Sequence, residues 1–133
     1  MSEEYAETVR AMLEAFNRDD VDRVVVAFTE DCVLYEPPEM PDRLATGYRG
    51  HDGIRAWADN LRRTADVRFE QSDSSGTGDV IVSEWVGRGR GQVSNVSLQW
   101  TSFVVLRMRD GRIARAEAFL TMSEALEAAG LSE

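Results

Sequence analysis

Glu36 is the side chain whose type and position best fit acid–base chemistry. It follows the short apolar stretch 32–35 and directly precedes Pro37. A carboxylate at the mouth of an apolar pocket loses hydration of its charged form, which raises its pKa toward the working pH and suits it as a general base. The same spacing also fits a solvated carboxylate at the end of a strand, beside a polar loop. The sequence therefore makes Glu36 a candidate catalytic residue and leaves its surroundings open.

His51 is the second candidate catalytic residue, because it is the single histidine of the chain. Histidine is the side chain whose ordinary pKa lies closest to neutral pH. His51 follows Gly50 at the expected start of a helix, where the positive end of the helix dipole lowers the pKa of an imidazole. The alternative is a residue at the helix entry whose ring is hydrogen-bonded locally.

Residues that are rare or missing exclude several kinds of site. The chain of 133 residues has 15 arginines and no lysine, with one cysteine and one histidine. Without lysine there is neither Schiff-base chemistry nor a phosphate-loop lysine. One cysteine and one histidine cannot form a structural zinc site or an intrachain disulfide. We therefore expect no metal site and no cofactor.

The charge balance limits the partners. Asp and Glu number 24, and the formal net charge is −9. Such a chain is repelled by nucleic acids and by anionic membranes, so we expect neither as a partner. The sequence has no apolar run of the ~20 residues that a membrane span needs, and its start lacks the basic and apolar regions of a signal peptide. These features predict a cytoplasmic protein that binds neither nucleic acids nor membranes.

Helices dominate the first half of the expected structure. Apolar residues recur at helical spacing over 5–16 and 21–28, and Asp20 is placed to cap the second segment. A short strand is expected over 32–36. The three prolines then fall within five residues, which predicts an extended loop over 37–47. A third helix follows Gly50.

Strands dominate the second half. The period changes to two, and strands are expected over 67–70, 80–86, 96–108 and 112–120. Asp110-Gly111 predicts a tight hairpin turn, and 72–78 and 87–95 are expected to be turns. The glycine- and arginine-rich stretch 87–91 is followed by a strand rather than a helix, so it is not expected to bind phosphate. Ser123 is placed to cap a short last helix that ends at Gly130. These elements predict one α+β domain over residues 1–133.

The order of these elements and the local sequence of several stretches resemble those of the nuclear transport factor 2-like superfamily. The resemblance is strongest to its SnoaL-like (polyketide cyclase-like) family. The stretches that carry the resemblance are 16–22, 28–33, 48–54, 110–113 and 123–131. The resemblance implies a cone-shaped, cystatin-like fold with three N-terminal helices packed on a curved, mostly antiparallel sheet. It also implies a conical pocket and a homodimer formed through the outer sheet face. The residues expected on that outer face are apolar and alternate along one strand: Val96, Leu98, Trp100, Val104, Leu106 and Met108.

The resemblance also suggests which side chains line the pocket. The polar candidates are Tyr35, Tyr48, Gln99 and Thr101, and the apolar candidates are Met12, Phe16, Leu34, Trp57 and Phe103. The alternative for each is an ordinary place in the core.

Comparison with ketosteroid isomerases, which share this scaffold, gives a mixed result. Their general-base carboxylate matches Glu36. Their two oxyanion donors correspond, without gaps, to Met12 and Phe103, which cannot donate hydrogen bonds. The last strand offers Glu117 but no aspartate of the kind that SnoaL-type cyclases use, and 82–88 lacks the arginine and aspartate element of the related epoxide hydrolases.

Two functions of different classes follow. The first is a cofactor-independent isomerase, cyclase or lyase that acts on a small apolar carbonyl compound with Glu36 as general base. The second is a non-catalytic domain that binds a small ligand or forms dimers, because a fold does not determine a reaction.

Overall fold

The structure is a computed structural model that describes residues 2–40, 43–91 and 93–131. The helices pack on a single curved β-sheet. The strands are β1 (Phe28–Tyr35), β2 (Tyr48–Arg49), β3 (Arg68–Thr77), β4 (Val80–Arg90), β5 (Ser97–Arg109) and β6 (Arg112–Phe119). Their order across the sheet is β2-β1-β6-β5-β4-β3. β1 and β6 run parallel, and the other neighbours run antiparallel. The expected α+β class and mostly antiparallel sheet are confirmed.

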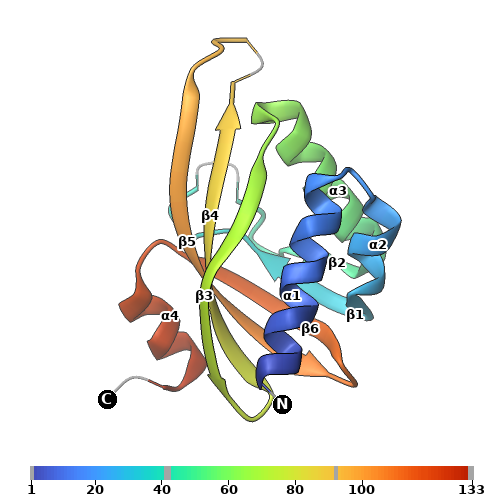
Figure 1. Cartoon of the computed structure of the whole chain (residues 1–133), viewed down its shortest axis with the longest axis vertical. Coiled ribbons are helices and arrows are strands. Elements are labelled where there is room, and N and C mark those ends of the chain that lie inside the picture. Colours follow the sequence, from blue (N-terminus) through green and yellow to red (C-terminus); the bar gives the residue numbers. More distant parts are fainter. Residues whose placement is uncertain (1, 41–42, 92, 132–133) are drawn as a thin grey trace.

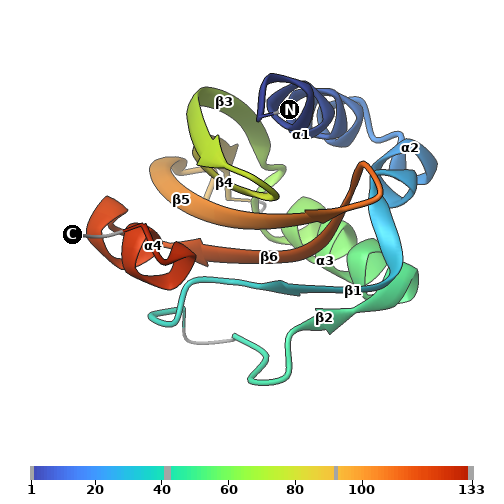
Figure 2. The same cartoon turned by 90° about the horizontal axis from the view of Figure 1, so that it is seen from below.

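Helices cover both faces of this sheet, but unequally. The helices are α1 (Ser2–Asn17), α2 (Val21–Val26), α3 (Gly50–Ala65) and α4 (Met122–Ala129). α1, α2 and α3 lie on one side of the sheet and α4 lies on the other (Figures 1 and 2). α1 and α3 bury the apolar faces that their helical spacing predicts, with Val9 and Ile54 fully buried. Among the described residues, no helix is long and apolar enough to cross a membrane.

The second helix is shorter than predicted. Asp20 caps α2, and its side chain accepts a hydrogen bond from the backbone N–H of Arg23 at 3.4 Å. Phe28 was expected on this helix but begins β1 instead. The reason is pairing with the last strand, because the N–H of Ile113 donates to the carbonyl of Ala27 at 2.8 Å.

β3 and β4 extend through segments that were expected to be turns. The predicted turn over 72–78 is wrong, because β3 continues to Thr77 and only Gly78-Asp79 turn the chain. The predicted turn over 87–95 is wrong in its first part, because β4 continues to Arg90. Serine, glycine and aspartate disfavour strands on their own. Here the backbone pairing between β3 and β4, and between β4 and β5, outweighs that local preference.

The hairpin and the last helix follow the predicted pattern with one change. Asp110 and Gly111 both have positive φ angles, 54° and 77°, as a tight two-residue turn requires. Gly130 ends α4 in the left-handed conformation, as expected. The N-cap of α4 is Thr121 rather than Ser123, and its hydroxyl accepts from the N–H of Glu124 at 3.2 Å.

Two apolar clusters hold these layers together. The larger lies between the concave face of the sheet and helices α1 to α3. The smaller lies under α4 on the convex face and contains Val82, Val105, Ala125 and Ala129. Both faces of the central strands are therefore apolar where a helix covers them.

Candidate functional site

An apolar cavity of about 470 Å³ lies between α3 and the concave face of the sheet. Trp57 belongs to the α3 wall, β4 to β6 form the opposite wall, and residues 34–37 close one side at the end of β1. Met40, Leu98 and Leu120 also line the cavity, and they are 41%, 45% and 39% exposed. These three side chains therefore mark where the cavity opens to solvent.

Glu36 lines this cavity because it keeps the phase of the strand before it. Cys32 and Leu34 point to the concave side and are buried in the larger cluster. Side chains two residues apart share a face of a strand, so Glu36 follows them. Its Oε1 atom is buried, and the guanidinium of Arg43 donates from Nε to the Glu36 carbonyl at 2.8 Å. Among the described residues that line the cavity, Glu36 is the single carboxylate.

Aromatic rings form much of the remaining wall. All three tryptophans of the chain, Trp57, Trp85 and Trp100, line the cavity together with Phe69. Phe69 lies at the centre of this group, and its ring centroid is 6.3, 5.6 and 6.1 Å from those of the three tryptophans in the same order. The cavity therefore suits a ligand with flat or ring-shaped apolar surface.

A buried polar chain holds one of these rings in place. Trp85 donates from Nε1 to the hydroxyl of Ser83 at 2.8 Å. Ser83 is fully buried and donates in turn to Oε1 of Gln71 at 2.5 Å. The side-chain amide of Gln71 donates to the carbonyl of Ala6 at 3.1 Å. This chain satisfies the indole N–H outside the cavity, so Trp85 presents an apolar surface to it.

The face of β5 that was assigned to the outside is in fact the inner face. Leu98, Trp100 and Val104 line the cavity, and Leu106 and Met108 are buried in the larger cluster. Alternation along a strand separates two faces, but it does not say which face a helix layer covers. The more apolar face of β5 was assigned to a dimer interface, whereas in the structure it faces the helices, and only Phe103 and Val105 of the other face join the cluster under α4.

Because the faces of β5 were exchanged, two residues predicted to line the cavity, Thr101 and Phe103, do not line it. Phe103 lies on the convex face and packs against the cluster under α4. Thr101 shares the phase of Phe103 and is not among the residues that line the cavity. Gln99 does line the cavity, but it is exposed.

Three other predicted lining residues lie behind the cavity. Met12 is 2% exposed and belongs to the larger cluster. Phe16 belongs to the same cluster, with its ring centroid 5.3 Å from that of Trp57. Tyr48 is buried, and its hydroxyl accepts a hydrogen bond from Nδ2 of Asn60 at 3.0 Å. None of the three is among the described residues that line the cavity.

His51 lies at the start of α3, away from the lining of the cavity. Its Nε2 atom is 3.0 Å from the carbonyl oxygen of Phe28. That distance fits a ring whose Nε2–H donates to β1 and ties the start of α3 to the sheet.

Tyr35 contributes to the cavity wall beside three arginines. The guanidinium carbons of Arg43 and Arg115 are 5.3 and 5.0 Å from its ring centroid. Arg49 donates from Nη2 to its hydroxyl at 3.4 Å. A hydrogen bond to Glu117 raises the pKa of Arg115 above its usual value. Because its hydroxyl already has a cationic donor, Tyr35 is tied into this surface cluster.

Ser102 is a polar lining residue that the sequence did not identify. It is 5% exposed and lies on the inner face of β5, between Trp100 and Val104. Once Trp100 is placed in the cavity, alternation places Ser102 there too. The two-residue spacing between Trp100 and Ser102 could have identified Ser102 as a lining residue. It did not, because the face of β5 that holds both residues was expected to lie on the outside.

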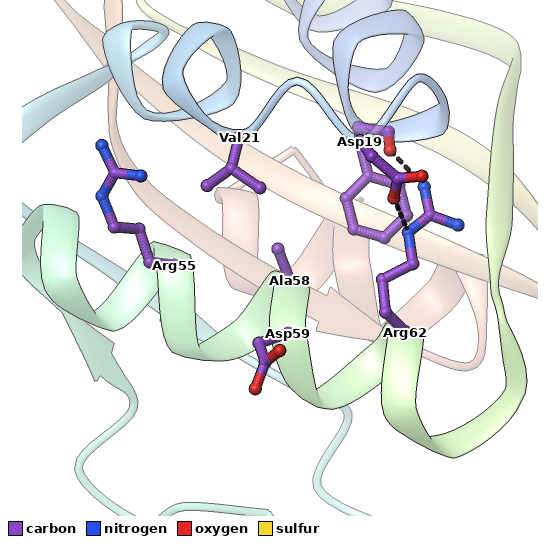
Figure 3. Close-up of a pocket in the computed structure, with 7 residues that line it drawn as sticks. Asp19, Val21, Arg55, Ala58, Asp59 and Arg62 are labelled. Carbon is purple, nitrogen blue, oxygen red and sulfur yellow. Dashed lines mark hydrogen bonds and ion pairs between the residues drawn. The ribbon is translucent and has the colours of Figure 1, made fainter.

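A smaller cleft of about 220 Å³ lies between α2 and α3, next to the end of α1 (Figure 3). Its charged groups are engaged in ion pairs: Arg62 with Asp19 at 2.5 Å, and Arg55 with Asp22 at 2.8 Å. Arg62 also donates to the carbonyl of Phe16. These contacts fasten the helices to one another, so the cleft is a structural junction.

Metal-binding side chains do not cluster in the part of the chain that the structure describes. No group of three or more histidine, cysteine, aspartate or glutamate side chains is placed there to hold an ion. The described lining of the cavity includes one carboxylate and no imidazole or thiol.

Solved structures share this fold over nearly the whole chain. An NTF2-like protein of unknown function from Burkholderia pseudomallei is 24% identical, with a TM-score of 0.77 over 95% of this chain and 97% of that chain. TerC, co-crystallised with polyporic acid, is 18% identical, with a TM-score of 0.77 and coverage of 97% and 99%. A protein with a ketosteroid isomerase-like fold from Catenulispora acidiphila, in complex with trimethylamine, is 18% identical, with a TM-score of 0.74 and coverage of 95% and 94%.

The sequence itself matches a family model. A search of curated proteins found no significant relative. The model of the SnoaL-like domain, however, matches residues 9–116, which include α2, α3 and all the strands up to the middle of β6. That match agrees with the fold and with the expected resemblance. The chain belongs to the SnoaL-like domain family, on the nuclear transport factor 2-like fold.

Proposed function

We propose that this protein is a cofactor-independent enzyme of the isomerase, cyclase or lyase type that acts on a small, mostly apolar carbonyl compound. One observation carries the proposal: among the described residues, Glu36 is the single carboxylate that lines a cavity whose other walls are largely apolar and aromatic. A carboxylate in such surroundings is a suitable general base, because water does not compete for the proton that it removes.

The proposed chemistry begins with proton removal. Glu36 takes a proton from the carbon next to the substrate carbonyl, and the electron pair moves onto the carbonyl oxygen to form an enolate. If the substrate has a carbon–carbon double bond next to the carbon that loses the proton, the enolate is conjugated with it, and protonation by Glu36 at the far carbon gives an isomer. Attack of the enolate carbon on a second carbonyl instead closes a ring, and protonated Glu36 returns its proton to the alkoxide that forms. The enolate oxygen needs a hydrogen-bond donor. The hydroxyl of Ser102, which lines the cavity, is the donor that we propose.

The structural relatives support a small organic ligand. TerC was co-crystallised with polyporic acid, and the protein from Catenulispora acidiphila with trimethylamine. We carry over from them only that this scaffold accepts small organic molecules. The aromatic lining around Phe69 favours a ring-containing ligand for this chain.

The test separates binding from proton transfer. Binding of 1-tetralone, a bicyclic ketone, is followed by quenching of the three tryptophans, since all three line the cavity. Proton removal is followed in D2O by NMR, as exchange of the hydrogens next to the carbonyl. We expect wild-type protein to accelerate this exchange, and Glu36→Gln to slow it by at least about 100-fold with binding unchanged.

Glu39→Gln is the matched control, because Glu39 is an exposed carboxylate of the same loop. It should leave both binding and exchange unchanged. Equal exchange rates for wild type and Glu36→Gln would contradict the proposed base. Binding without any accelerated exchange would favour the second candidate, a non-catalytic ligand-binding domain. That candidate is favoured by the positions corresponding to the isomerase donors, because Met12 is buried in the core and Phe103 lies on the convex face.

A further inference from the structure

Gly87 and Trp100 form a directly opposed pair on β4 and β5. Gly87 is buried and lies on the inner face of β4. A Cβ atom built at Gly87 would lie 2.7 Å from both Cε2 and Cζ2 of the Trp100 ring, and 3.0 Å from Cε1 of Phe69. These distances are well inside the 3.4 Å at which ordinary van der Waals contact begins. The indole therefore occupies the space that a side chain at position 87 would need.

The backbone does not explain why position 87 is glycine. Gly87 is not among the glycines with positive φ, so its conformation is open to any residue. The close approach of the aromatic rings is the remaining reason. Glycine in the interior of a strand otherwise costs stability, and it often marks a place where another group approaches closely.

Trp100 lies between the opening of the cavity and its interior. It follows the partly exposed Leu98 at the opening and precedes the buried Ser102 on the same face of β5. Its ring meets Phe69 edge-on, with an interplanar angle of 85°. Because Phe69 blocks one side and β4 lies behind, an indole displaced from Gly87 must move toward the cavity.

We propose that Gly87 and Trp100 together set the size of the largest ligand that the cavity accepts. Gly87 contributes without touching the ligand, since the missing side chain leaves room for the indole beside β4. Trp100 contributes directly, because its ring forms the wall. This inference rests on the proposed small-molecule cavity, and it adds the pair that determines size selectivity.

The experiment compares a small and a large planar probe. Dissociation constants of 2-naphthol, with two fused rings, and 1-hydroxypyrene, with four, are measured by isothermal titration calorimetry. Gly87→Ala should weaken 1-hydroxypyrene by about tenfold or more, as expected for a pocket reduced by a methyl-sized step. It should change the affinity for 2-naphthol by less than about threefold.

The double variant Gly87→Ala/Trp100→Ala should recover 1-hydroxypyrene binding, because removal of the indole removes the clash. Trp100→Ala alone should favour the larger probe over the smaller one relative to wild type. This variant keeps the inference testable if Gly87→Ala fails to fold. Gly78→Ala is the control for a glycine substitution that adds no steric contact, because no atom lies within 4 Å of its Cβ position. Its positive φ of 62° makes alanine strained there, so this variant is expected to lose stability in the β3–β4 turn. It should leave the ratio of the two affinities unchanged.

Equal weakening of both probes in Gly87→Ala, or no rescue by the double variant, would overturn the inference. Wild-type protein that binds neither probe would overturn it together with the small-ligand cavity. Wild-type protein that binds both probes with the expected size effects, but fails to accelerate ketone exchange, would refute the proposed enzyme and leave this inference standing.

Discussion

Glu36 reaches the cavity because a strand places every second side chain on one face. The same rule, applied along β5, brings Trp100 and Ser102 to the opposite wall. The residues that line the cavity thus come from distant parts of the chain, and each is placed by the local geometry of its own strand. A carboxylate, a hydroxyl and aromatic rings meet there as a consequence.

Asp31 provides a prediction at the residue scale. Hydrogen bonds from Arg109, and then from Thr29, hold the pKa of the Asp31 carboxyl below its usual value of 3.8. A carboxyl whose pKa is lowered by folding stabilises the protein above its unfolded-state pKa, and this stabilisation is lost as the pH falls through the folded-state pKa. We expect Asp31→Asn to lower the free energy of unfolding at neutral pH. The difference from wild type should shrink as the pH falls below about 5.

Urea unfolding at a series of pH values measures this difference. Glu30→Gln is the control, because Glu30 is the exposed neighbour for which no ion pair is found among the described residues. A difference between Asp31→Asn and wild type that stayed constant from neutral to acidic pH would contradict the assignment.

At the scale of elements, α4 is the helix that distinguishes the two faces of the sheet. It packs on the convex face over Phe103 and Val105, and Arg107 donates to the carbonyl of Ala128 near its end at 2.9 Å. α4 therefore covers the apolar central part of the convex face, and these residues need no second chain to bury them.

The N-cap residue Thr121 stabilises the start of α4. The hydroxyl of Thr121 accepts from the N–H of Glu124, and it donates to the Glu124 carboxylate at 2.9 Å. Removing an N-cap side chain costs about 1 kcal/mol. We expect Thr121→Ala to reduce the free energy of unfolding by about that amount in urea.

Ser123→Ala is the matched control, because this residue was the expected cap but lies inside the helix. It should change the free energy of unfolding by less than about 0.5 kcal/mol. A larger loss for Ser123→Ala than for Thr121→Ala would show that the helix begins where the sequence suggested.

At the scale of the whole molecule, dimerisation stays a prediction that follows from the family resemblance. The apolar face of β5 that first supported it lies inside, so that argument no longer holds. Outside α4, the convex face of β4 and β5 includes Glu84, Val86, Arg88 and Thr101, a mixed surface rather than an apolar one.

Sedimentation velocity over a range of protein concentrations measures the oligomeric state. We expect a homodimer that dissociates on dilution, and Thr101→Arg should weaken it if the convex face is the interface. A charge inserted into an interface typically weakens association by about 2 kcal/mol or more. A single monomeric species at every concentration would contradict the prediction.

The sequence alone determined a large part of this molecule. Helical spacing located α1 and α3, Asp110-Gly111 located a hairpin, and the order of the elements identified the class and the family. It also placed Glu36 at the end of β1, since the phase from Leu34 is local information. These features depend on residues that are neighbours along the chain.

Only the tertiary structure decided which faces the elements present to one another. Alternation along β5 separates its more apolar face from its more polar face, but it does not say whether the apolar face meets the helices or a second copy of the chain. The polar end of β3 is a strand only because β4 pairs with it. Likewise, glycine at position 87 is explained by the ring of Trp100 on the next strand. In each case the deciding contact is made with another strand or helix, so it is absent from the residue pattern of the segment itself.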